Sequence, residues 1–335
     1  MIARHVRKLE AYVPGEQPKA RNVVKLNTNE NPYPPSPACA TALKRFCLDR
    51  LRRYPDPVFS DLREALAELN GTSPENIFVG NGSDEVLSVA AKTFVEDGEA
   101  IASLDPSYSL YKTLAAIRDV KWVGVPGLKA APKAALFLLT NPNAPTGEFR
   151  EPEEVAAFAK KFRGVVIVDE AYADFARANC MALTTAKANR NVIVMRTFSK
   201  SYSLAGLRVG YCVGPKPLID AMYKVKDSYN VDAVAQAVAL AATKDQKWMR
   251  GNVAKVVRTR ARFVAELEKR GWNVIPSESN FVFAKPPAPA KAADIFAALR
   301  KKNIFVRYFP GPKTGDRLRI TIGTDGQMKA LLAAL

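Results

Sequence analysis

Between about residues 41 and 240, short apolar runs alternate with amphipathic stretches that have the spacing of helices. The apolar runs are NIFVG (76–80), AIASL (100–104), KWVGV (121–125), ALFLLT (135–140), VVIVDE (165–170), NVIVMR (191–196) and VGYCVG (209–214). The stretch EPEEVAAFAKKF (151–162) has a proline and acids in its first turn, as helix starts do. This alternation predicts an α/β fold with a mostly parallel, seven-stranded sheet sandwiched by helices.

The pattern changes after about residue 245, where a long amphipathic helix precedes a mixture of strands and helices. The segments are VRTRARFVAELEKR (257–270), WNVIPSESNFVFAK (272–285), AADIFAALRKK (292–302), IFVRYF (304–309) and DRLRITIG (316–323). They predict a smaller α+β layer. We therefore expect a large domain over residues 41–244, a small C-terminal domain over 245–335, and an N-terminal arm over 1–40 that forms part of the small domain.

Composition narrows the chemistry that this 335-residue chain can perform. Its one histidine, His5, argues against histidine metal sites and against Ser/His/Asp or Cys/His hydrolases. The four cysteines form no CxxC pair, which disfavours a structural zinc and fits a reducing compartment. No apolar run approaches the roughly 20 residues that span a bilayer, and the first residues lack the apolar segment of a secretion signal. We expect a cytoplasmic protein without a metal or a membrane contact.

The net charge of +17 has three possible explanations: a nucleic-acid partner, an anionic small substrate, or solubility alone. The basic residues are spread along the chain and mix with acids at helical spacing, as in residues 257–270. A solvated helix face explains that pattern better than a DNA-reading helix does. We expect no nucleic-acid partner, and a basic nucleic-acid-binding protein remains the alternative from a different class.

Ligands of open parallel sheets bind beyond the carboxyl ends of the strands, so the residues after each apolar run are site candidates. The turn GNGSDE (80–85) leads from a strand into a helix, where free backbone amides suit a phosphate, although Ser and Asp also cap helices. Tyr108 and Tyr111 follow AIASL, either as core residues or as a stacking platform. Each of these signals is weak when taken separately.

A carboxylate and a lysine follow two further runs. Asp169 closes VVIV, where it is either an ordinary loop residue or a partly desolvated charge that needs a partner. Lys200 follows NVIVMR among small and hydroxyl residues, with Arg208 shortly after it, and is either a solvated charge or a nucleophile. The chain has no nucleotide-binding glycine motif. An anion site, an aromatic ring, a carboxylate and a lysine at one sheet edge together indicate pyridoxal phosphate (PLP), which a lysine amine holds.

A set of short motifs follows the order and spacing of a known family over nearly the whole chain. The motifs are LEAYVPG (9–15), LNTNENPYPPSP (26–37), RRYPDP (52–57), GNGSDE (80–85), DPSYSLY (105–111), NPNAPTG (141–147), VDEAY (168–172), TFSKSYSLAGLRVGY (197–211), SNFVF (279–283) and RLRITIG (317–323). The chain resembles the PLP-dependent aminotransferases of fold type I, and most closely the histidinol-phosphate aminotransferase family. The resemblance implies the PLP-dependent transferase fold type I.

The resemblance also implies roles around the cofactor. Lys200 resembles the lysine that bonds to the cofactor, and Asp169 the partner that keeps the pyridine nitrogen protonated. Tyr108 would stack on the ring, and Tyr172 would hydrogen-bond to its phenolic oxygen. The residues that resemble the 5′-phosphate site are Ser83, Asp84, Glu85, Ser199 and Arg208. Tyr54 resembles the tyrosine that reaches the cofactor phosphate of the neighbouring subunit, which implies a homodimer.

One position departs from the family pattern. In many relatives the residue directly before Pro-Thr-Gly is an asparagine that contacts the ring oxygen, whereas this chain has Ala144. Asn143, one residue earlier, either turns inward to bind the cofactor or is satisfied within its own loop. We retain Asn143 as a candidate cofactor residue.

On the substrate side, Arg319 resembles the arginine that grips a substrate carboxylate or phosphate, and Arg307 is a second candidate clamp. Tyr12 and Asn29 lie on arm segments that border the site in relatives, whereas we interpret Arg317 as a solvated strand residue. The implied reaction interconverts L-histidinol phosphate and 2-oxoglutarate with imidazole-acetol phosphate and L-glutamate, a step of histidine biosynthesis. An aromatic amino-acid aminotransferase and a threonine-phosphate decarboxylase on the same framework are the nearest alternatives.

Overall fold

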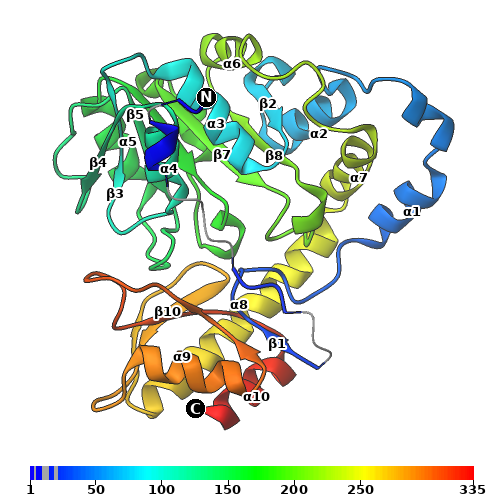
Figure 1. Cartoon of the computed structure of the whole chain (residues 1–335). Coiled ribbons are helices and arrows are strands. Elements are labelled where there is room, and N and C mark those ends of the chain that lie inside the picture. Colours follow the sequence, from blue (N-terminus) through cyan, green and yellow to red (C-terminus); the bar gives the residue numbers. More distant parts are fainter. Residues whose placement is uncertain (4, 10–14, 19–21) are drawn as a thin grey trace.

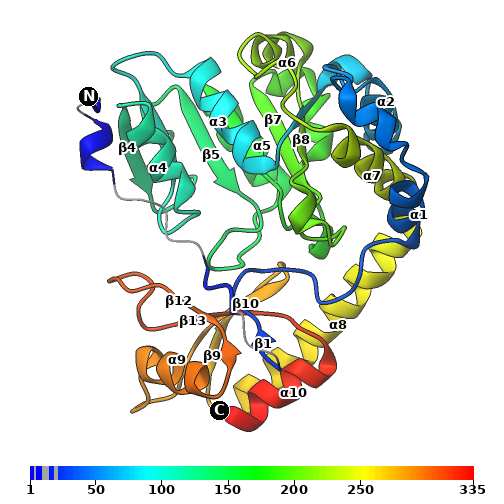
Figure 2. The same ribbon diagram turned by 45° about the vertical axis from the view of Figure 1, so that its right-hand side comes forward.

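A computed structural model describes residues 1–3, 5–9, 15–18 and 22–335 of the chain. The larger part carries a seven-stranded sheet, and the smaller part below it carries a four-stranded sheet (Figure 1). Helix α8 (Gln246–Lys269) runs diagonally from the larger part into the smaller one, and the segment before α1 (Pro37–Arg45) passes between them (Figure 2). The predicted helix over 257–270 is therefore the second half of a longer helix.

All seven predicted runs form strands of the large sheet. Its order is β2-β8-β7-β6-β5-β3-β4, in which only β8 opposes the direction of the others. The strands are β2 (Ile77–Gly80), β3 (Ala100–Leu104), β4 (Lys121–Val125), β5 (Leu136–Thr140), β6 (Val165–Asp169), β7 (Val192–Thr197) and β8 (Gly210–Val213). The inner strands are buried on both faces, which is why their sequences are continuous apolar runs.

Helices cover both faces of this sheet. The helices are α1, α2 (Ser60–Asn70), α3 (Ser83–Phe94), α4 (Leu110–Ile117), α5 (Pro152–Lys161), α6 (Lys216–Tyr223) and α7 (Ala233–Lys244). Successive side chains of β5 point to opposite faces: Leu136 and Leu138 pack in a cluster with α3 and α4, whereas Phe137 and Leu139 pack in a cluster with α5. The sheet is therefore the centre of a three-layer sandwich, as predicted.

The smaller part has an antiparallel sheet of order β12-β13-β10-β9. Its elements are β9 (Asn273–Ile275), β10 (Phe281–Lys285), α9 (Ala292–Lys301), β12 (Arg307–Tyr308), β13 (Leu318–Thr321) and α10 (Asp325–Ala334). The prediction of a single strand over 304–309 is wrong, because two strands lie there. β12 belongs to this sheet, whereas β11 (Ile304–Phe305) pairs in parallel with β1 (Val24–Lys25) in a separate two-stranded sheet. The N-terminal arm thus packs with the C-terminal part of the chain.

The remaining short elements are 3-10 helices: η1 (Val6–Lys8), η2 (Leu48–Arg52), η3 (Pro74–Asn76), η4 (Ala173–Phe175), η5 (Met181–Thr184), η6 (Lys187–Asn189) and η7 (Ala205–Leu207). The predicted boundary after residue 40 falls inside α1, and the boundary after 244 falls just before α8. The division into domains stays a prediction. Among the described residues, none of the helices combines the length and the apolar composition that a membrane crossing requires.

Candidate active site

A cavity of about 1030 Å³ opens between the carboxyl ends of the large sheet, the arm and the small sheet. Most of the predicted site residues line it: Asn29, Ser83, Asp84, Tyr108, Asp169, Tyr172, Ser199, Lys200, Arg208, Arg307 and Arg319. Segments as distant as the arm and β13 therefore contribute to one site. Of the described residues, no group of three or more His, Cys, Asp or Glu side chains is arranged to hold a metal ion.

Asp169 ends β6 as a buried carboxylate on the cavity wall. Its Oδ2 accepts a hydrogen bond of 2.7 Å from the Tyr111 hydroxyl, and its Oδ1 accepts one of 3.1 Å from the backbone N–H of Ala171. None of the residues that the structure describes forms an ion pair with Asp169. Burial raises the pKa of its carboxyl to about 6, against the opposing effect of the Tyr111 hydrogen bond. A cationic group bound in the cavity would complement this carboxylate.

Lys200 follows β7 and reaches into the same cavity. Its Nζ donates a hydrogen bond of 3.2 Å to the backbone carbonyl of Thr28 and lies 5.8 Å from the centre of the Tyr172 ring. Burial and, second, the charge of Arg319 lower the pKa of the lysine to about 8. The charge of Arg208 also lowers this pKa, but its effect is smaller than that of Arg319. At pH 7 about a tenth of the amine is therefore neutral and nucleophilic, far more than for an ordinary lysine.

An anion cradle lies at the N-terminus of α3. Gly82 precedes the helix with φ +79°, and no side chain of the described residues caps the first turn. A Cβ on Gly82 would lie 2.5 Å from Arg208 Nη2, and one on Gly210 would lie 2.5 Å from the backbone N of Ser83. Arg208 Nη1 also donates to Ser199 Oγ at 3.3 Å. The glycines thus let a guanidinium, a hydroxyl and the helix N-terminus converge, which suits a phosphate.

Tyr172 connects the strand ends to the arm. Asn29 Nδ2 donates a 3.0 Å hydrogen bond to the Tyr172 hydroxyl, and Asn29 Oδ1 accepts one of 3.0 Å from Thr321 Oγ1. Asn280 Nδ2 donates to the Asn29 carbonyl at 2.9 Å. Asn29 has φ +56°, a left-handed conformation that asparagine tolerates better than most residues. The small sheet therefore fixes the arm residue that positions the Tyr172 hydroxyl.

Two arginines face the cavity from the small sheet. Arg307 on β12 and Arg319 on β13 are directly paired across the antiparallel ladder. Arg319 Nη2 donates to the Asn27 carbonyl at 2.9 Å, and its guanidinium lies 5.4 Å from the Phe281 ring centre. Cross-strand pairing brings the two cations close enough to bind one anionic group together.

Some predicted residues do not line this cavity. Glu85 Oε2 accepts a hydrogen bond of 2.7 Å from Asn230 Nδ2, so the Glu85 side chain is used outside the cradle. Asn143 Nδ2 donates to the Pro106 carbonyl at 3.1 Å and to Thr146 Oγ1 at 3.0 Å. The Asn143 side chain thus has one partner in its own loop and one in the loop that follows β3, and Ala144 lines the cavity. A cofactor contact of Asn143 stays a prediction.

Tyr54 also lies outside the cavity: it is 80% exposed and stacks on Tyr229 with ring centres 4.3 Å apart. Tyr12 lies outside the described residues. The sequence interpretation missed a functional role for Tyr111, whose hydroxyl also lies 2.6 Å from Thr140 Oγ1. Tyr111 lies in the first turn of α4, three residues after Tyr108, and the two rings contact each other edge to face with centres 5.6 Å apart.

The comparisons with known proteins agree with this geometry. The model of the class I and II aminotransferases matches residues 21–335. The chain is 44% identical to a histidinol-phosphate aminotransferase of Synechocystis sp., over 100% of this chain and 97% of the relative. It is 43% identical to one of Syntrophotalea carbinolica, over 100% and 98%. The chain belongs to the histidinol-phosphate aminotransferase family.

Solved structures of the family and its neighbours share the fold. A histidinol-phosphate aminotransferase of Sinorhizobium meliloti in complex with pyridoxal-5′-phosphate aligns with a TM-score of 0.89 and 28% identity, over 100% of this chain and 96% of that one. An L-threonine-O-3-phosphate decarboxylase of Porphyromonas gingivalis aligns with a TM-score of 0.81 and 22% identity, over 92% and 97%. The predicted fold class, enzyme class and PLP cofactor are confirmed by the family. The fold alone does not choose the reaction.

The raised pKa of Asp169 predicts a pH-dependent stability of the apoprotein. Between about pH 4 and 6 the unfolded carboxyl has lost its proton and the folded one retains it, so this group lowers the free energy of unfolding as the pH rises. Relative to wild type, Asp169→Asn is therefore expected to gain about 3 kcal/mol between pH 4 and 7, measured by urea unfolding. The exposed residue Asp220 gives the control Asp220→Asn. A difference for Asp169→Asn that stays constant with pH contradicts the assignment.

Proposed function

We propose that the enzyme transfers the amino group of L-histidinol phosphate to 2-oxoglutarate with PLP as its cofactor, and that it also catalyses the reverse transfer from L-glutamate to imidazole-acetol phosphate. One observation carries the proposal: a single cavity joins a lysine of lowered pKa, a buried carboxylate without a cationic partner among the described residues, an anion cradle and two arginines. The full-length similarity to proteins named histidinol-phosphate aminotransferase supports the choice of substrate.

The residues of the cavity fit PLP. The cradle formed by Arg208, Ser199 and the start of α3 would hold the phosphate, and Lys200 would anchor the cofactor through its amine. Asp169 would face the protonated ring nitrogen, because this cation supplies the charge partner that the buried carboxylate lacks. Tyr108 would stack on the ring. When bound, PLP supplies an electron sink for the charge left at the substrate Cα after proton removal.

Lys200 would also transfer the proton. Its lowered pKa leaves part of the amine neutral, so that it can accept a proton from the substrate Cα and later donate it. Tyr111 holds Asp169 in place through its 2.7 Å hydrogen bond. Tyr172, oriented by Asn29, presents its hydroxyl at the cavity wall. These side chains are positioned before a substrate enters, which limits the reorganisation during the reaction.

Arg307 and Arg319 would bind the anionic end of both substrates. L-histidinol phosphate carries a phosphate and glutamate carries a carboxylate, and a planar guanidinium pairs with either group through two parallel hydrogen bonds. The two arginines lie on neighbouring strands of the small sheet, across the cavity from the strand ends that carry Asp169 and Lys200. The opposite end of each substrate would thereby be directed toward Lys200.

We also propose a homodimer in which Tyr54 completes the active site of the neighbouring subunit. Tyr54 is 80% exposed in the isolated chain and does not line the cavity of that chain. It lies among exposed apolar side chains that would be buried against a second copy: Leu43, Leu48, Leu51 and Val58. The free cysteines support a reducing compartment, and we propose the cytoplasm.

Mixed dimers test the shared site. Co-expressed Tyr54→Ala and Lys200→Ala chains form a mixed dimer in which one site has both an intact Lys200 and an intact Tyr54 from its partner. We expect activity of the mixed dimer at limiting PLP to rise at least several-fold above either variant alone, up to about half of wild type per dimer, because one of its two sites is intact. If Tyr54 acts within its own chain, every site is defective and the mixture shows no gain.

Product analysis tests the substrate. The holoenzyme is incubated with 2-oxoglutarate and either L-histidinol phosphate, phenylalanine or threonine phosphate, and glutamate and carbon dioxide are measured. We expect glutamate to form fastest from L-histidinol phosphate. Faster formation from phenylalanine assigns an aromatic aminotransferase instead, and release of carbon dioxide from threonine phosphate assigns a decarboxylase.

A further inference from the structure

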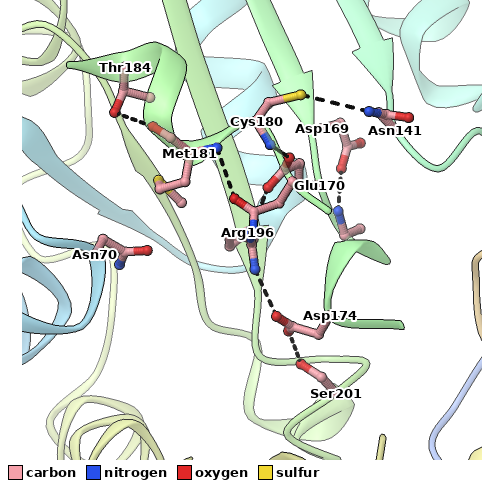
Figure 3. Close-up of polar contacts among 12 residues, drawn as sticks. Asn70, Asn141, Asp169, Glu170, Asp174, Cys180, Met181, Thr184, Arg196 and Ser201 are labelled. Atoms are coloured by element: carbon pink, nitrogen blue, oxygen red, sulfur yellow. Dashed lines mark hydrogen bonds and ion pairs between the residues drawn. The ribbon is translucent and has the colours of Figure 1, made fainter. Parts of the chain in front are cut away.

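A buried ionic network lies behind the active site (Figure 3). Arg196 on β7 donates from Nε to Glu170 Oε2 at 2.8 Å and from Nη1 to Asp174 Oδ1 at 2.7 Å. The Glu170 side chain is 0% exposed and that of Arg196 is 11% exposed. None of these three side chains lines the cavity. None of these three side chains has a part in the proposed reaction.

The network ends at the backbone neighbours of two site residues. Glu170 directly follows Asp169, and its Oε1 accepts a hydrogen bond from the backbone N–H of Cys180. At the other end, Asp174 Oδ2 accepts a hydrogen bond from the hydroxyl of Ser201, which directly follows Lys200 (Figure 3). One guanidinium therefore connects the chain segment of Asp169 to that of Lys200.

Charge holds this arrangement in place. A carboxylate as buried as Glu170 destabilises the fold unless a cation pairs with it. Arg196 supplies that cation: although burial lowers its pKa, the charges of Glu170 and Asp174 outweigh burial and raise it above its ordinary value. The guanidinium thus holds the two carboxylates in place behind the site.

We propose that Arg196 is a positioning residue, which clamps the turn 170–174 to the loop 199–203 and so fixes Lys200 relative to Asp169. The clamp is built of two charge-assisted contacts of the guanidinium and one hydrogen bond from a hydroxyl. The catalytic part of this inference rests on the proposed function. The structural part concerns the apoenzyme as well.

The loop itself offers a matched pair of variants. Ser201→Ala removes the terminal hydrogen bond of the network. Ser203→Ala makes the same change two residues away, where the buried hydroxyl has no hydrogen-bond partner among the described residues. Arg196→Lys keeps the positive charge but loses the planar guanidinium that contacts both carboxylates. Arg196→Met removes the charge and the contacts. Because Arg196→Met leaves a buried carboxylate unpaired and is expected to fold poorly, Ser201→Ala and Arg196→Lys carry the test.

Three readouts separate positioning from mere stability. In the apoenzyme, amide hydrogen exchange over both 170–176 and 199–203 is expected to be faster by about 3- to 10-fold in Ser201→Ala and Arg196→Lys, and unchanged in Ser203→Ala. In the holoenzyme, kcat with glutamate is expected to fall by about 3- to 10-fold with KM within about 2-fold. The pH midpoint of the visible absorbance of bound PLP is expected to shift in the same two variants only.

The possible outcomes are distinct. Exchange that accelerates in only one of the two segments, or a lower melting temperature with unchanged absorbance midpoint and kcat, overturns the clamp and leaves a purely structural network. Equal effects of Ser201→Ala and Ser203→Ala also overturn it. If the wild-type protein binds no PLP, the proposed function fails, and the exchange experiment on the apoenzyme still decides whether the two segments are clamped together.

Discussion

Lys200→Ala is expected to lower kcat for amino transfer by about 10³- to 10⁴-fold or more. The substitution removes both the amine that anchors the cofactor and the base that transfers the proton at the substrate Cα. We also expect PLP to bind without the visible absorbance of the wild-type holoenzyme. The measurement combines steady-state kinetics with an absorbance titration of the apoenzyme with PLP.

Two controls define this experiment. Lys200→Arg keeps a cation at the position, but a guanidinium does not lose its proton near neutral pH, so it is expected to be as inactive as Lys200→Ala. Lys216→Ala removes an exposed lysine that pairs with Asp220 outside the cavity, and is expected to keep wild-type activity. A Lys200→Ala enzyme within 10-fold of wild type refutes the role of this residue.

Arg319→Met is expected to reduce kcat/KM for both L-histidinol phosphate and glutamate by about 10²- to 10³-fold. Removing one partner of a partly buried charge pair typically costs 2 to 5 kcal/mol, about 30- to 4000-fold, because the substrate anion is left without its cation. Arg319 lies within the cavity and is fixed by its hydrogen bond to the Asn27 carbonyl. Most of the loss should therefore appear in KM.

Arg317, which lies directly before β13, provides the control. It donates to the Asn273 carbonyl at 2.9 Å and does not line the cavity. Arg317→Met is expected to change kcat/KM by less than about 2-fold. Arg319→Lys is expected to lose less kcat/KM than Arg319→Met, because the lysine still presents a positive charge to the substrate anion. Equal effects of the two methionine substitutions would show that the loss comes from disturbance of the strand rather than from a lost substrate contact.

The sequence predicted the large sheet well because its strands are buried on both faces. A run such as LFLLT in β5 is continuously apolar, as is typical of a strand buried on both faces, and amphipathic helices separate it from the next run. The strand over 304–309 was predicted as one element although it divides between two sheets. The division depends on pairing of β11 with β1, 280 residues earlier, which local patterns do not encode.

The site was predictable where a residue type itself determines the chemistry. Asp169 ends β6, Lys200 lies three residues after β7 and Arg208 lies two residues before the antiparallel strand β8, so the topology of the sheet brings all three to one edge. Asn143 was harder, because its side chain turns to its own loop and to Pro106, which depends on the local backbone path. The sequence predicts Arg196 only as the last residue of a strand. Its ionic partners are not predictable from the local pattern, because they lie in other segments.

The central claim is most directly tested by single-turnover absorbance of the PLP-loaded enzyme. On mixing with L-histidinol phosphate alone, the visible absorbance is expected to bleach within one turnover and to return on addition of 2-oxoglutarate. Phenylalanine and threonine phosphate at equal concentration are expected to bleach it at least about 10-fold more slowly. A protein that binds no PLP, or one that phenylalanine bleaches faster than L-histidinol phosphate does, would contradict the account.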